Sequence, residues 1–97
     1  MTSRSLPSLG SAWSLEVEDQ GRNLEVDFEI DTAKADQAWR IVLKRDGHVF
    51  FKGVRSTQAD GDVEVDRRVR DHRGTDRIVA RGINLVTGEV CRGALTI

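Results

Sequence analysis

Strict alternation of apolar and polar residues is the feature that most constrains the fold of this chain. In residues 24–30, apolar residues alternate with acidic ones, as Leu24, Val26, Phe28 and Ile30 against Glu25, Asp27 and Glu29. A period of two residues is typical of a β-strand with one buried face. The same period recurs in 13–18, 39–44, 62–66, 77–81 and 91–97. Residues 32–42 have too few apolar residues at helical spacing, so the sequence predicts an all-β fold.

Short runs of turn-forming residues separate these stretches and recur roughly every 8–13 residues. They include Asp19-Gln20-Gly21, Asp46-Gly47, Asp71-His72-Arg73-Gly74 and Thr87-Gly88. About seven short strands with such turns are typical of an antiparallel β-sandwich. We therefore expect a seven-stranded antiparallel β-sandwich that forms a single domain over residues 12–97. Residues 1–11 are rich in Ser, Gly and Pro, which predicts a flexible N-terminal tail.

Composition narrows the class of protein. The chain has 97 residues, a charged fraction of 32% and a hydrophobic fraction of 38%, values typical of one soluble globular domain. No apolar run approaches the ~20 residues that a membrane-spanning helix needs. Cys91 is the single cysteine, so no disulfide can form within the chain, which fits a reducing compartment. We expect a cytoplasmic protein that does not contact a membrane.

The stretch 37–51 predicts a hairpin with Trp39, Ile41 and Leu43 on its buried face. Two registers are open at the Asp46-Gly47 turn. A two-residue loop would pair Leu43 with Phe50 and direct Lys52 into the core. A three-residue loop would pair Leu43 with Val49 and leave Lys52 in solvent, so we favour it. Either register leaves one phenylalanine, Phe50 or Phe51, on the outer face.

The order and spacing of these strands resemble the immunoglobulin-like or fibronectin type III-like sandwich, with strands A, B, C, C′, E, F and G. Trp39 is similar to the core tryptophan of immunoglobulin domains. The run from Asp71 to Glu89 is similar to the pattern D-x-G-x-Y-x-C-x-A-x-N…G, with Asp76 at the tyrosine position and Ile78 at the cysteine position. The resemblance implies an architecture. It implies no particular function, because such sandwiches host many unrelated ones.

Several residues with chemical potential have a simpler structural interpretation. His48 and His72 each lie beside a turn, where we expect exposed side chains. Asp60-Gly61-Asp62 resembles a fragment of a calcium loop but lacks the other ligands, so we expect a turn. Cys91 alternates in phase with Leu95, which predicts a buried thiol. No spacing of nucleophile and base and no phosphate-binding loop is present, so we expect no enzyme, cofactor or metal site.

Charge is expected to divide between the two sheets. If strands A, B and E form one sheet, its outer face carries Glu16, Glu18, Glu25, Asp27, Glu29, Asp62, Glu64 and Asp66. Arg68 and Arg70 belong to the same side and are expected opposite Glu25. If strands C, C′, F and G form the other sheet, its outer face is basic with valines between the charges. One interpretation is that strands simply need polar outer faces and that the signs fall by chance.

The alternative interpretation, which we develop, is a recognition face. Arginine and aromatic residues are enriched in interfaces, and outward valines are not required by a solitary sandwich. We expect a non-enzymatic protein-binding or assembly module whose candidate face comprises Arg40, Val42, Lys44, Phe50, Lys52, Arg77, Val79, Arg81 and Arg92. The partner would be another protein or a second copy. Binding of an anionic polymer such as nucleic acid is the alternative, less favoured because stacking aromatics are scarce.

Overall fold

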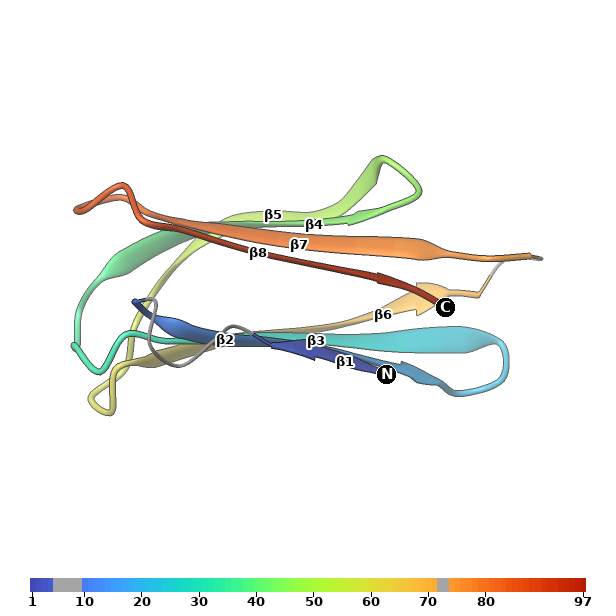
Figure 1. Cartoon of the computed structure of the whole chain (residues 1–97), viewed down its shortest axis with the longest axis horizontal. Helices are drawn as coiled ribbons and strands as arrows, with labels where there is room; N and C mark the ends of the chain where they lie inside the picture. Colours follow the sequence, from blue (N-terminus) through green and yellow to red (C-terminus); the bar gives the residue numbers. More distant parts are fainter. Residues whose placement is uncertain (5–9, 72–73) are drawn as a thin grey trace.

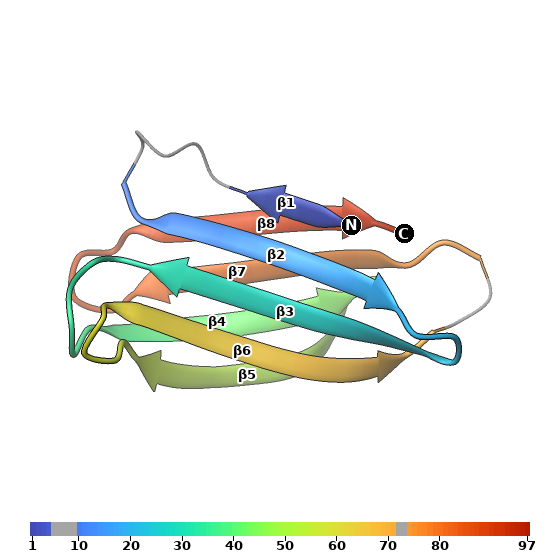
Figure 2. The same ribbon diagram turned by 90° about the horizontal axis from the view of Figure 1, so that it is seen from below.

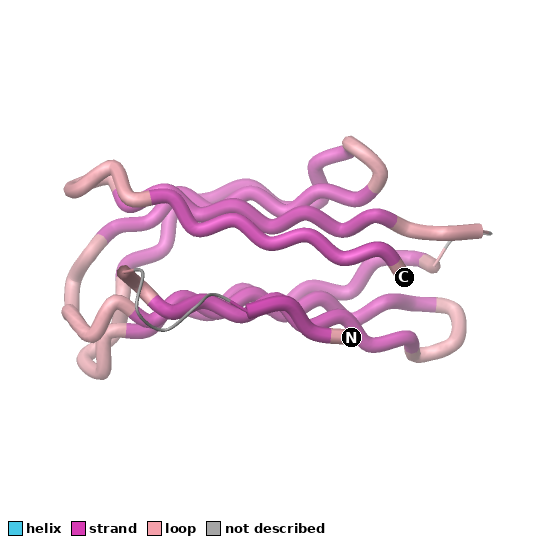
Figure 3. Tube along the Cα trace, in the orientation of Figure 1, coloured by secondary structure: helices cyan, strands magenta, loops and turns pink. Residues whose placement is uncertain are grey.

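A computed structural model gives the structure of the chain and describes residues 1–4, 10–71 and 74–97. These ranges contain eight strands and no helix. The strands are β1 (Thr2–Arg4), β2 (Ala12–Asp19), β3 (Asn23–Asp31), β4 (Ala38–Arg45), β5 (His48–Ser56), β6 (Asp62–Arg70), β7 (Arg77–Asn84) and β8 (Val90–Thr96). The prediction of an all-β fold is confirmed, as the magenta and pink trace of Figure 3 shows.

The strands form two antiparallel sheets that lie face to face (Figure 1). Each sheet has four strands, in the orders β1-β2-β3-β6 and β5-β4-β7-β8. Figure 2 looks onto the first sheet and shows the second behind it. The two antiparallel layers agree with the expected sandwich, while the number of strands is eight rather than seven.

The additional strand is β1, which lies within the stretch that we expected to be a flexible tail. It pairs antiparallel with β2, with Thr2 opposite Glu16. The Met1 ammonium donates to the Val17 carbonyl, and the Val17 N–H donates to the Met1 carbonyl. Residues 5–9 of the expected tail lie outside the described residues.

The core lies between the sheets and consists of the inward residues of the alternating stretches. Along β3, every second residue from Leu24 to Ile30 is buried, while the acidic residues between them are partly exposed. Trp39 of β4, an inner strand of the other sheet, is fully buried. Cys91 is also part of this core, with 3% of its surface exposed. The predicted inward faces of these strands are therefore confirmed, whereas Val49, expected inward opposite Leu43, lies opposite Lys44 and is exposed.

The hairpin between β4 and β5 differs from the favoured prediction. Its loop is the two-residue turn Asp46-Gly47, and both residues have positive φ, 50° and 85°. Two positive φ values are typical of a type I′ turn, in which Asp-Gly is a preferred pair. Arg45 consequently lies opposite His48. The predicted three-residue loop is wrong.

A β-bulge then shifts the register between Leu43 and Lys44, so that Leu43 lies opposite Phe51. The bulge takes up Phe50 as the extra residue and returns Lys52 to the outer face, opposite Val42. Phe50 and Phe51 are both partly buried and pack against the core. The expected phenylalanine on the outer face is therefore wrong, because the bulge turns both rings toward the core.

The edge strands β5 and β6 run side by side along one side of the sandwich (Figure 2). Phe51 of β5 closes the gap between the sheets there. The guanidinium carbon of Arg67, from β6, lies 4.5 Å from the centroid of the Phe51 ring, and that of Arg55 lies 5.1 Å away. In cation–π contacts of this kind, the guanidinium itself covers the face of an aromatic ring.

Candidate interaction face

The register of β5-β4-β7-β8 brings basic residues of all four strands onto one outer surface, which we call the basic face. Val42 lies opposite Lys52 on one side and Arg81 on the other, and Arg81 lies opposite Arg92. Three cations therefore flank one valine in a single row across the sheet. Arg40 lies two residues before Val42, on the same face of β4.

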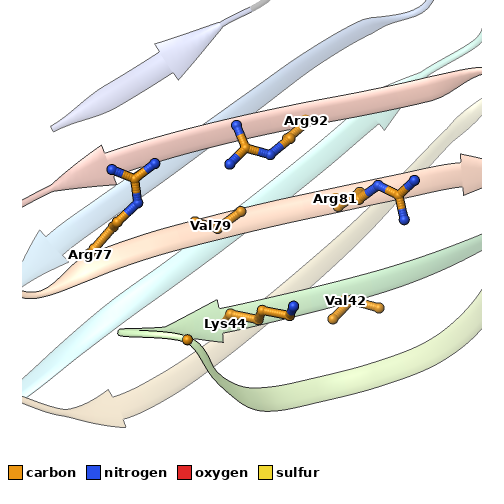
Figure 4. A pocket seen from close by; sticks show the side chains of 7 residues that line it. Val42, Lys44, Arg77, Val79, Arg81 and Arg92 are labelled. Carbon is orange, nitrogen blue, oxygen red and sulfur yellow. The ribbon is translucent and has the colours of Figure 1, made fainter.

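The next row contains Lys44 and Val79, which lie directly opposite each other. A pocket of about 460 Å³ opens over both rows and is lined by Val42, Lys44, Gly47, Arg77, Val79, Arg81 and Arg92 (Figure 4). Val42 and Val79 are half-buried and form its apolar floor, and the cationic residues around them are exposed. Figure 4 shows that Arg77 and Arg92 extend toward each other, whereas Arg81 extends the other way.

The hairpin turn forms one end of the pocket because hydrogen bonds hold it against β7. The Asp46 carboxylate accepts a hydrogen bond from the Arg77 backbone N–H at 2.9 Å. The Asp46 N–H donates to the Arg77 carbonyl, also at 2.9 Å. Gly47 is thereby placed at the rim of the pocket. Both contacts use the backbone of Arg77, so its guanidinium takes no part in them.

Most of the predicted face is found together. The pocket contains Val42, Lys44, Arg77, Val79, Arg81 and Arg92 of the predicted set. Arg40 and Lys52 lie on the basic face beyond the pocket, and Phe50 packs against the core instead. The sequence did not indicate Gly47, because its role depends on the contact between the turn and β7. Val54, opposite Arg40 and about half exposed, also lies on this face and was not among the predicted residues.

Among the described residues, the cations that line the pocket have no carboxylate partner. Within the part of the chain that the structure describes, none of Lys44, Arg77, Arg81 and Arg92 forms an ion pair with a carboxylate. Arg81 and Arg92 are directly opposite each other, and like charges in that position destabilise a sheet. The face therefore carries positive charge that nothing in the described molecule neutralises.

The outer surface of β1-β2-β3-β6, which we call the acidic face, has the opposite arrangement. Carboxylates lie directly opposite one another in the pairs Glu16–Asp27, Glu18–Glu25, Asp27–Asp66, Glu29–Glu64 and Asp31–Asp62. The predicted position of Arg68 opposite Glu25 is confirmed, whereas Arg70 lies opposite Asn23. The predicted division of charge between the sheets is therefore found in the structure.

Asp27 lies at the centre of the acidic face. Burial raises its pKa from 3.8 to about 6, and the charges of Glu64, Asp66, Glu29 and Glu16 add to the rise. Its buried Oδ1 has no hydrogen-bond partner among the residues that the structure describes. Burial, together with a hydrogen bond to Glu64, also raises the pKa of Glu29. Carboxylates here are crowded enough to hold protons more tightly than free ones do.

The other sequence candidates have structural roles. Burial, with a smaller contribution from the charge of Glu89, raises the pKa of the Cys91 thiol to about 11, so this thiol is protonated at neutral pH. The Asp60 carboxylate accepts a hydrogen bond from the Asp62 N–H at 3.2 Å, which is a turn contact. His48 is exposed beside the hairpin turn, as expected, and His72 lies outside the described residues.

Two further observations concern metal ligands and membrane-spanning helices. Among residues 1–4, 10–71 and 74–97, no group of three or more histidine, cysteine, aspartate or glutamate side chains has an arrangement that could hold a metal ion. The same ranges contain no helix of the length and apolarity needed to cross a membrane.

Comparison with known proteins gives no match among family models, curated proteins or solved structures.

Proposed function

We propose that this chain is a non-enzymatic binding module that takes a carboxylate-bearing protein partner on its basic face. The observation that carries the proposal is the pocket with an apolar floor and a rim of cations that have no ion-pair partner among the described residues. A carboxylate can accept two parallel hydrogen bonds from one arginine, which makes arginine well suited to recognising acidic side chains. Val42 and Val79 would contact the aliphatic part of such a side chain.

Binding is favoured over catalysis by the chemistry of the pocket. Its described lining residues are valine, glycine, lysine and arginine. These residue types supply positive charge and apolar surface. Among them there is no histidine, carboxylate, cysteine or hydroxyl group to act as a nucleophile or a general base at neutral pH.

A protein partner is favoured over nucleic acid by the same lining. Binding of single-stranded nucleic acid commonly uses aromatic side chains on which bases stack, and the described lining residues include none. The chain also has a net charge of −1, so attraction to a long polyanion is confined to one face. Nucleic acid remains an outcome that the binding experiment detects.

We further propose that the fold is of the immunoglobulin-like or fibronectin type III-like kind. In support, β2-β3-β6 corresponds to strands A, B and E, and β5-β4-β7-β8 to strands C′, C, F and G. Trp39 is buried in β4, the strand that corresponds to C. On this proposal β1 is an addition at the edge of the first sheet.

Binding of a fluorescent glutamate-rich peptide and of a single-stranded oligonucleotide with equal charge tests the proposed function. Arg81→Glu removes a cation from the pocket, and Arg68→Glu makes the same change in net charge on the acidic face. We expect Arg81→Glu to weaken peptide binding at least about tenfold, and Arg68→Glu to change it little. Equal losses in both variants would show a non-specific charge effect, and tighter binding of the oligonucleotide would contradict a protein partner.

A further inference from the structure

We propose that the partner of the basic face is the acidic face of a second copy, so that chains stack head to tail. This inference rests on the proposed function and names its partner. The observation that carries it is charge complementarity within one molecule. One sheet presents the pairs of carboxylates described above, and the other presents Arg40, Lys44, Lys52, Arg77, Arg81 and Arg92.

Each face brings like charges close together in the isolated molecule, and these charges repel one another. Asp27 lies between Glu16 and Asp66, and Arg81 lies beside Arg92. Like charges directly opposite each other destabilise a sheet. Contact between the acidic face of one copy and the basic face of the next would reduce the repulsion between like charges on both faces.

The two faces also match in spacing and size. Neighbouring strands in any sheet lie about 4.8 Å apart, so charged side chains on adjacent strands have the same spacing on both faces. The molecule measures 39 × 25 × 21 Å, and Figure 1, drawn down the shortest axis, shows the layers stacked along the intermediate one. A broad face of 39 × 21 Å is on the order of the ~800 Å² that each partner contributes to a standard interface.

The geometry predicts an open stack. The acidic and basic faces point in opposite directions from the two layers (Figure 1). A contact between two different surfaces is heterologous, and it continues from copy to copy unless the rotation closes a ring. A stack of any length therefore has one free acidic face at one end and one free basic face at the other.

The stack should respond to salt and pH. Because the contact is largely between charged groups, added salt will weaken it. Asp27 is surrounded by Glu16 of β2, Glu29 of β3 and Glu64 and Asp66 of β6, with Glu25 and Arg68 further along the face. Cations from a second copy would lower the pKa of Asp27, so association would release protons and strengthen as the pH rises through about 6.

Sedimentation velocity on the full chain tests the proposal with two variants. Arg81→Glu/Arg92→Glu reverses the basic face, and Glu64→Lys/Asp66→Lys reverses the acidic face. We expect the unchanged chain to sediment faster with rising concentration at low salt, and each variant alone to remain monomeric. The two variants mixed should associate with each other, because the first contributes an intact acidic face and the second an intact basic face. Circular dichroism checks that both variants are folded.

Two results would overturn the stack. One is an unchanged chain that stays monomeric at low salt and neutral pH over the whole concentration range. The other is a mixture of the two variants that forms no dimer. If the chain still binds the glutamate-rich peptide through Arg81, the proposed function stands and only the self-contact is wrong. If peptide binding is lost as well, both proposals fail.

Discussion

At the scale of single residues, Asp27 carries the largest electrostatic penalty on the acidic face. Its pKa is higher in the folded chain, about 6, than its ordinary value of 3.8. The folded state therefore binds this proton more tightly than the unfolded state does. It follows that Asp27 lowers the stability of the fold progressively as the pH rises from about 4 to about 6, and by a constant amount above that range.

We expect Asp27→Asn to raise the free energy of unfolding at pH 7 by about 1 kcal/mol, a value reduced for solvent screening because the side chain is partly exposed. The asparagine keeps the shape of the side chain and removes its charge. Urea unfolding of both proteins at pH 7 and pH 4 measures the effect. The difference should shrink at pH 4, and a variant that is less stable than the unchanged chain at pH 7 would contradict the prediction.

At the scale of elements, the hairpin shows what local sequence can and cannot specify. The alternation correctly requires Lys52 to lie outside the core. Two solutions meet that requirement: a three-residue loop, or a two-residue loop followed by a bulge. The structure has the second, with Phe50 as the extra residue. The choice depends on how Phe50 and Phe51 pack against the core, which the sequence of the hairpin does not contain.

Strand β1 was not predicted from the sequence, for a related reason. Residues 2–4 carry no alternation of apolar and polar side chains. Their strand conformation follows from hydrogen bonds to β2, which provides a free edge at that side of the sheet. Such pairing uses backbone groups, so it leaves little trace in the side chains.

The contact between the loop before β4 and the loop before β6 gives a sharp test at this scale. Gly61 has φ +87°, and an added Cβ would lie 2.5 Å from the Lys34 backbone nitrogen. Gly21 has the same φ of +87°, with nothing within 4 Å of an added Cβ. We expect Gly21→Ala to cost about 1 kcal/mol from backbone strain alone, and Gly61→Ala ~3 kcal/mol or more because the loop must move.

Chemical denaturation of the two variants under the same conditions measures this difference. The pair separates steric contact from backbone conformation, since both glycines have the same φ. Equal losses of stability in both variants would show that the loop beside Gly61 moves away freely.

At the scale of the whole molecule, the sequence predicted the two sheets and their charges but not the pocket. Alternation assigns each side chain to a face, and strand order then groups the faces, so the division between acidic and basic sides could be predicted. The pocket also depends on the turn at Gly47, which Asp46 holds against Arg77. Contacts between segments distant in the chain are not visible in local periodicity.

The opposed faces also give the molecule an electric dipole across its layers, which its net charge of −1 conceals. A strongly dipolar protein turns toward a charged surface and adsorbs by the face of opposite sign. At pH 7 and low salt, we expect retention on both cation-exchange and anion-exchange resins. Reversing the basic face with Arg81→Glu/Arg92→Glu should abolish retention on the cation exchanger only. Retention of this protein on only one of the two resins would instead show that its charges are evenly mixed over the surface.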